Sequence, residues 1–132
     1  MALQPQFAAT PRVQVGALSA ANTNRNGTGT IVDCFDAHAT NGSIVRKITV
    51  QATVTTTAGM VRLYVTVGGT TYLYREISVS AITASGTVAA FNAQITLYDA
   101  NSDGLVLPAG AKIRASTNAA EAFNVIVEGM DY

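Results

Sequence analysis

The chain has 132 residues, the length of one compact domain, and a domain of this size buries roughly two thirds of the surface that its unfolded form exposes. Eight Lys and Arg side chains balance eight Asp and Glu, and only 12% of the residues are charged. A protein without a basic field gathers neither nucleic acid nor anionic lipid. We therefore expect no nucleic-acid partner and no membrane partner.

The surface is polar through hydroxyl groups rather than through charges. Threonine occurs 17 times and lysine only 2 times. Threonine supplies a polar surface at strand positions and keeps a high β propensity. Because proteins with a net charge near zero tend to associate, we expect this chain to work inside an assembly.

Cysteine usage and the apolar runs indicate where the chain is made. Cys34 is the only cysteine, which leaves no disulfide within the chain, and its apolar neighbours predict a small buried hydrophobe. The sequence shows no signal-peptide pattern and no apolar run long enough for a membrane helix. We therefore expect synthesis in the cytoplasm.

Residues 1–27 are predicted to form an extended N-terminal arm, and residues 28–132 a folded domain. Pro5 and Pro11 bias the residues before them toward extended conformations, so the segment cannot continue as a helix. Such an arm is either disordered or held by a neighbouring molecule, and we expect a neighbouring molecule to hold it.

That expectation depends on the apolar residues of the arm. Phe7, Val13, Val15 and Leu18 are too apolar for a solvated tail, and the two valines alternate with polar residues as in a short strand.

From Thr28 onward the apolar residues recur at every second position, the pattern of half-buried strands. The predicted strands are 28–35, 43–56, 60–67, 70–79, 88–98, 104–107, 111–117 and 122–130. The three strands between residues 43 and 79 are predicted to form one antiparallel meander, with hairpin connections at Ala58-Gly59 and Gly68-Gly69. Many short strands without a helical segment predict an all-β fold, an antiparallel β-sandwich of the jelly-roll type.

One turn has the residues of a calcium loop. Asp99, Asn101 and Asp103 offer oxygen ligands at alternate positions, and Gly104 follows them. The twelfth position of the loop is Gly110 instead of a bidentate glutamate, and no helix flanks the segment. An ordinary strand-to-strand turn uses the same residues, so the turn is the favoured interpretation and a bound cation is the weaker one.

No arrangement of side chains predicts catalysis. His38, the only histidine, lies four residues from Cys34 with no oxyanion-hole loop nearby. Paired carboxylates can hydrolyse glycosides, and the nearby pairs are Asp33 with Asp36 and Glu121 with Glu128. No cluster of aromatic residues around either pair provides a platform for a sugar. We therefore expect neither an enzyme nor a bound cofactor.

Three tyrosines are predicted to lie together on the outer face of adjacent strands. Strict alternation places Tyr64, Tyr72 and Tyr74 opposite the apolar rows, near Arg62 and Arg75. Aromatic residues with arginine are typical of protein interfaces. The alternative is a second layer of the same chain that packs over them.

The order of several segments resembles a family of small head decoration, or cement, proteins of tailed bacteriophages. The segments are NTNRNGTGTI at 22–31, RLYV at 62–65, LVLPAG at 105–110, IRAST at 113–117 and EAFNVIVEG at 121–129. The resemblance covers nearly the whole chain from Thr10 onward.

The resemblance implies a structural protein with a jelly-roll-like sandwich, a homotrimer that binds the major capsid protein on the capsid surface of the virion. Phe7, Arg12, Val13 and Val15 would contact the shell or a sister subunit, and the tyrosine patch would make the second contact. The alternative is the tip module of a phage tail fibre that binds a receptor or glycan, where a cation in the Asp99–Asp103 loop would fit.

Overall fold

The computed structural model describes residues 7–132, and within that range every regular element is a β-strand. The strands are β1 (Thr10–Leu18), β2 (Val32–Asp36), β3 (Ser43–Ala52), β4 (Gly59–Val67), β5 (Thr70–Val79), β6 (Asn92–Thr96), β7 (Tyr98–Asp99), β8 (Ser102–Asp103), β9 (Leu105–Leu107), β10 (Lys112–Thr117) and β11 (Phe123–Asp131). Among these described residues, no helix is long and apolar enough to span a membrane.

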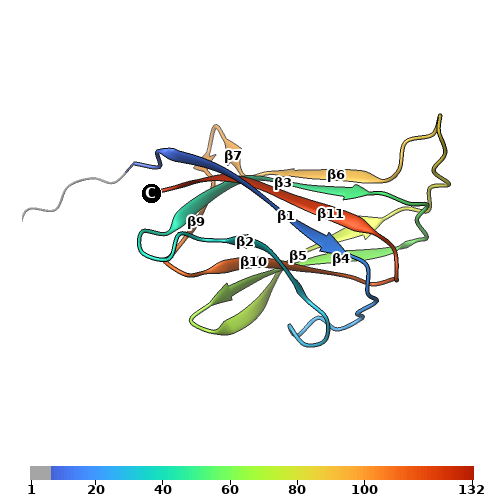
Figure 1. Cartoon of the computed structure of the whole chain (residues 1–132), viewed down its shortest axis with the longest axis horizontal. Coiled ribbons are helices and arrows are strands. Elements are labelled where there is room, and N and C mark those ends of the chain that lie inside the picture. Colours follow the sequence, from blue (N-terminus) through green and yellow to red (C-terminus); the bar gives the residue numbers. More distant parts are fainter. Residues whose placement is uncertain (1–6) are drawn as a thin grey trace, which may run out of the picture.

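Two antiparallel sheets pack face to face as a sandwich (Figure 1). The first sheet has the strand order β1-β11-β3-β6, with β9 also paired to β3, and the second has the order β2-β10-β4-β5. Along the chain these strands alternate between the two sheets, except where β5 follows β4 in the second sheet and the short β9 follows β6 in the first. This is the connectivity of a jelly roll, so the predicted fold class is confirmed.

The core forms because alternate residues of both sheets point inward. Strand β11 has a strictly alternating burial pattern, with Phe123, Val125 and Val127 buried in the core. Residues of the facing strands β4 and β10, among them Leu63 and Ile113, belong to the same hydrophobic cluster. The apolar periodicity of the sequence thus corresponds to one continuous core between the two sheets.

The predicted three-strand meander is wrong at its first connection. Strand β3 pairs with β11, β6 and β9, while β4 pairs with β10 and β5. The six residues 53–58 cross from one sheet to the other, and Gly59 has an ordinary negative φ. Gly68 and Gly69 have φ values of 60° and 80°, so they alone form the two-residue hairpin turn that the sequence predicted.

The predicted boundary of the arm at residue 27 also needs correction. Thr10–Leu18 is the edge strand β1, which pairs with β11 over its whole length, and Leu18 is buried in the core. Nine paired residues fix this segment in the sandwich, whereas the predicted arm had placed it outside. Residues 1–6 of the predicted arm, including Pro5, lie outside the described residues.

Candidate functional site: the outer face of β1

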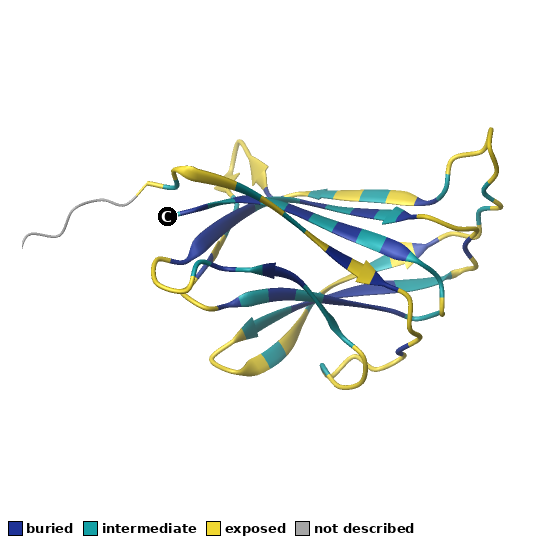
Figure 2. Cartoon of the chain, viewed as in Figure 1, coloured by how far each residue is buried: buried dark blue, intermediate teal, exposed yellow. Residues whose placement is uncertain are grey.

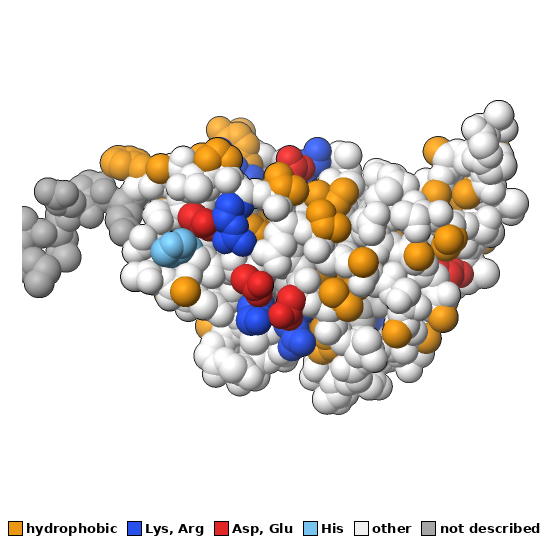
Figure 3. Space-filling model, viewed as in Figure 1, with side chains coloured by type: hydrophobic (Ala, Val, Ile, Leu, Met, Phe, Trp, Pro, Cys, Tyr) orange, Lys and Arg blue, Asp and Glu red, His pale blue; other side chains and the backbone are white. Residues whose placement is uncertain are grey.

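Strand β1 turns two valine side chains away from its own core, although Leu18 at its end points into the core. Val13 and Val15 are 65% and 52% exposed, while Arg12 and Gln14, which alternate with them, point inward and are half-buried. Figure 2 shows β1 exposed along most of its length, and Figure 3 shows hydrophobic side chains over its course. A strand on the edge of a sandwich normally has the opposite orientation, with apolar residues inside.

The inward polar side chains of β1 close the edge between the two sheets. Arg12 Nη1 donates hydrogen bonds to the backbone oxygen of Asp36 at 2.7 Å and to Asp131 Oδ1 at 2.9 Å. Its guanidinium carbon lies 4.5 Å from the centre of the Phe35 ring. Gln14 Oε1 accepts a hydrogen bond from the Asp36 amide at 2.9 Å. These bonds fix the orientation of β1, because the reverse orientation would leave them unmade.

The apolar side of β1 continues onto neighbouring residues. Phe7, just before the strand, is 78% exposed, and Val15 pairs with Ile126 of β11, whose side chain lies on the same outer face. We call Phe7, Val13, Val15 and Ile126 the β1 apolar surface. Phe7, Val13 and Val15 are exposed and Ile126 is half-buried, and exposed apolar residues that gather on one surface mark interaction sites on soluble proteins.

Of the four predicted arm contacts, three lie on this surface and one does not. Phe7, Val13 and Val15 are accessible to a partner. Arg12 instead bonds within its own chain and forms an ion pair with Asp131. Hydrogen bonds from Ser43 and Arg12 lower the pKa of the Asp131 carboxyl, although its burial alone would raise that pKa.

The three predicted patch tyrosines do not lie on one exposed face. Tyr64 points outward from β4 as predicted, yet it is fully buried, because residues 19–31 fold over the second sheet. We call residues 19–31 the covering loop. Tyr64 Oη donates a hydrogen bond to the backbone oxygen of Asn24 at 2.8 Å. Tyr64 is therefore covered by its own chain, as the alternative interpretation expected, but by a loop rather than by a second sandwich layer.

A β-bulge separates the other two tyrosines from Tyr64. The pairing of β4 with β5 shifts between Leu63 and Tyr64, so Tyr74 is an extra residue that packs against the core. Tyr72 pairs with Val65 and is 59% exposed. Strict alternation could not predict this, because a bulge inverts the faces on one side of it.

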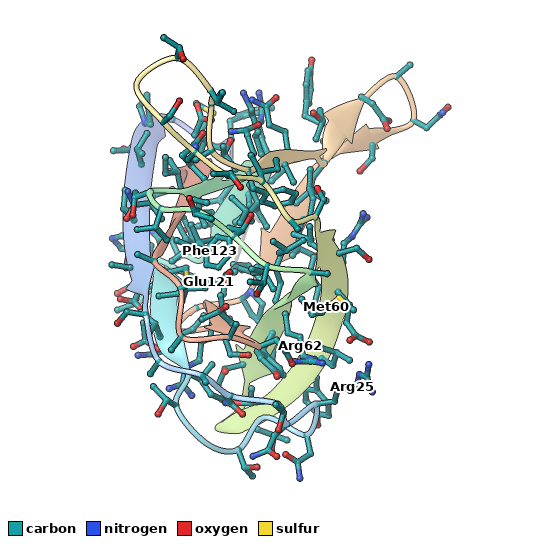
Figure 4. The ribbon with its side chains drawn as sticks, turned by 90° about the vertical axis from the view of Figure 1, so that its right-hand side faces the viewer. Arg25, Met60, Arg62, Glu121 and Phe123 are labelled. Carbon is teal, nitrogen blue, oxygen red and sulfur yellow. The ribbon has the colours of Figure 1, made fainter. Side chains whose placement is uncertain are left out.

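An ion-pair network holds the covering loop to the sheet. Arg25 Nε of the loop lies 2.8 Å from Glu76 Oε2 of β5, and Arg62 Nε of β4 lies 3.2 Å from the same oxygen. Arg62 and Arg25 lie near each other at this end of β4 and β5 (Figure 4). Hydrogen bonding to Arg25 lowers the pKa of Glu76.

The other candidate residues take part in local structure. Asp99 Oδ1 accepts a hydrogen bond from the Asn101 amide at 2.8 Å within the β7–β8 hairpin. His38 Nδ1 accepts hydrogen bonds from the amides of Thr40 and Asn41. In residues 7–132, no three His, Cys, Asp or Glu side chains are grouped so that they could hold a metal ion.

The predicted carboxylate pairs and Cys34 have structural surroundings. Lys112 Nζ lies 3.0 Å from Asp33 Oδ2 and 3.4 Å from Asp36 Oδ1, which places the acids of the first pair around one cation. Glu121 accepts hydrogen bonds from Thr57, and Glu128 Oε2 lies 3.9 Å from Lys47 Nζ. The two acids of the second pair therefore have different partners. Cys34 is buried, as predicted.

Two solved structures are similar to this chain. One is a chain of the cyanophage Pam1 capsid asymmetric unit, with a TM-score of 0.46, 18% identity, and coverage of 100% of this chain and 92% of that chain. The other is from the structure of infectious bursal disease virus Gx strain, with a TM-score of 0.31 and 15% identity, covering 98% of this chain and 36% of that chain. No family model and no curated protein matches the sequence.

Proposed function

We propose that this chain is a structural protein of a bacteriophage virion, which decorates the head by binding the major capsid protein through the β1 apolar surface. The observation that carries the proposal is the orientation of β1. Val13 and Val15 face solvent while Arg12 is bonded inside. The fold thus presents an apolar strip that its own chain leaves uncovered.

A weak contact that is repeated many times is sufficient to bind a protein to a capsid shell. Burying a valine side chain stabilises a complex by roughly 1.5 kcal/mol or more, so a few residues give only modest affinity per copy. A shell offers many equivalent positions, and contacts of linked copies add through multivalency. Because the surface is apolar and the chain has formal net charge +0, binding should change little between low and high salt.

Self-association is the second part of the proposal. A net charge near zero favours association, and the decoration role that the sequence resemblance implies involves a homotrimer. Sedimentation equilibrium of the purified chain should give three times the mass of 13.7 kDa. A monomer at all concentrations would contradict the trimer and leave the capsid contact to be judged by binding alone.

Co-sedimentation with capsids that lack the protein tests the capsid contact. The double substitution Val13→Thr and Val15→Thr keeps the shape and the β propensity of both residues. We expect it to reduce capsid occupancy at least about tenfold, since it replaces apolar contacts at both positions. The matched control is Val88→Thr, at a valine that is 48% exposed in a different part of the chain.

Electron microscopy of the sedimented particles separates the outcomes. Density at fixed capsid axes that disappears with the β1 variant supports the proposal. No binding of the wild-type chain to capsids would overturn it. Binding to host cells instead would then favour the tail-fibre tip.

A further inference from the structure

A pocket of about 340 Å³ opens at the edge of the sandwich, where β5 faces residues 96–105. Its size is at the lower end of the range of roughly 300–1,000 Å³ that small-molecule sites occupy. No residue of the β1 apolar surface or of the covering loop lines it. The sequence did not indicate it, because its walls come from two segments that only the fold brings together.

One wall of the pocket is apolar and continuous with the hydrophobic core. Tyr74, the bulge residue of β5, packs against the core, as does Leu105 of β9. Leu97 also lines the pocket and is itself buried in the core cluster. The wall is therefore an aromatic and aliphatic surface that is backed by the core.

Two opposite charges line the same pocket without neutralising each other. Arg75 and Asp99 are both exposed, and within the described part of the chain neither belongs to an ion pair. Six of the eight basic side chains do form ion pairs, and Arg46 stacks on Tyr98 instead. The Arg75 guanidinium carbon lies 5.5 Å from the centre of the Tyr74 ring.

The polar groups that line the pocket have hydrogen-bonding capacity left for a ligand. Asp99 uses Oδ1 to accept the Asn101 amide, while Oδ2 has no such role in the hairpin. Arg75 supplies several N–H donors, and Thr96 adds a hydroxyl that both donates and accepts. The pocket thus has donors and acceptors beside an apolar wall, with no net charge.

We propose that this pocket binds one or two rings of a neutral saccharide. A sugar ring has an apolar C–H side that packs against Tyr74 and the leucines, and hydroxyls that accept from Arg75 and donate to Asp99. An anion or a cation would meet one charge of its own sign. A small zwitterion would satisfy both charges but would leave the apolar wall uncovered.

Nuclear magnetic resonance titration of the full chain tests the proposal. The probes are D-glucose, D-galactose, D-mannose and N-acetyl-D-glucosamine, with glycine as the zwitterionic comparison. At least one sugar should shift the amide signals of residues 74–75 and 96–105, with a Kd on the order of 1 mM. No shift there with any of the four sugars, or a response to glycine alone, would overturn the proposal.

A matched pair of substitutions identifies the site. Asp99→Asn keeps the Oδ1 acceptor for the Asn101 amide but replaces the charged Oδ2 by a donor, so sugar binding should weaken about tenfold. Asp103→Asn removes a charge from the same hairpin outside the pocket and should leave binding unchanged. Equal affinities of the two variants would contradict the assignment.

The saccharide site and the capsid contact can fail separately. The Val13→Thr and Val15→Thr variant should bind sugar as the wild type does, since neither residue lines the pocket. Conversely, Asp99→Asn should occupy capsids normally. Loss of both activities in either variant would indicate a folding defect, which the dispersion of the amide spectrum reveals directly.

Discussion

The hydroxyl of Tyr64 on β4 donates a 2.8 Å hydrogen bond to the backbone oxygen of Asn24, forty positions earlier in the chain. This bond ties the covering loop to the outer face of the second sheet. The loop crosses the strands in turn: Ala21 bridges Thr117 of β10, Asn24 meets Tyr64 of β4, and Gly27 lies against Thr71 of β5. A jelly-roll sheet that would otherwise face solvent on this side is thereby partly covered.

Tyr64→Phe should loosen the covering loop. The substitution removes the bond to Asn24 and leaves that carbonyl without its partner, which should lower the free energy of unfolding by about 1–2 kcal/mol. Urea denaturation measures the loss, and hydrogen exchange at residues 22–25 should accelerate. Tyr72→Phe is the control, because that side chain is exposed and should change neither quantity.

Acid should destabilise the fold partly through Glu76. Hydrogen bonding to Arg25 lowers the pKa of this carboxyl from its usual 4.5. A carboxyl with a depressed pKa in the folded state contributes stability at neutral pH, and this contribution is lost as the pH falls below about 4.5 through the folded pKa. The pKa values of Asp33 and Asp131 are also lowered, so these carboxyls contribute to the same loss of stability in acid.

Glu76→Gln isolates that contribution. Urea unfolding should show the variant less stable than the wild type at pH 7, with the difference shrinking toward pH 3. Asp103→Asn, at an acid outside the ion pairs of the described residues, should follow the wild type throughout. A difference between Glu76→Gln and the wild type that is constant with pH would show that the carboxyl charge plays no part.

Gly129→Ala should be strongly destabilising. A Cβ at Gly129 would collide with the backbone oxygen of Ile44, beside the bulge in the pairing of β11 with β3. Backbone cannot give way as a flexible side chain can, so the loss should be about 2 kcal/mol or more by urea denaturation. Gly86→Ala, where an added Cβ meets nothing within 4 Å, should stay within about 0.5 kcal/mol of the wild type.

Cys34 should resist modification in the folded protein. Burial raises the pKa of its thiol to about 12, and the thiolate is the reactive form. A chromogenic disulfide reagent at pH 8 should therefore label no thiol in the native protein and one thiol in urea. Rapid labelling under native conditions would show that β2 opens easily.

The element positions were largely predictable because they depend on local patterns. The strand predicted at 70–79 coincides with β5 (Thr70–Val79), since Gly68 and Gly69 mark its start through a turn that requires positive φ. The burial of Cys34 likewise follows from its immediate neighbours. The predicted strand at 28–35 begins four residues too early, because the polar residues before Val32 belong to the covering loop.

The sequence pointed to the apolar side chains of β1 as candidate contacts, but it did not show that this segment is a strand of the sandwich paired with β11. The sequence predicts that Val13 and Val15 contact a partner, and their exposure leaves them accessible to one, so this contact stays a prediction. Arg12 could not be assigned from the sequence, because Asp131, to which it bonds, lies 119 positions away. The bulge at Tyr74 was also invisible, because Leu73 and Ile77 follow one alternation in the sequence although the bulge places them on opposite faces of the sheet.

By itself, then, the sequence determined the all-β class, most strand positions and the hydroxyl-rich composition with few charges, since alternation and glycine turns act over a few residues. Only the tertiary structure decided which strands pair, that β1 shows its apolar side to solvent, and that a loop buries Tyr64. The physical reason is that these features depend on partners far apart in the chain. Which face of a strand is covered is a property of what packs on it, and no local pattern records that.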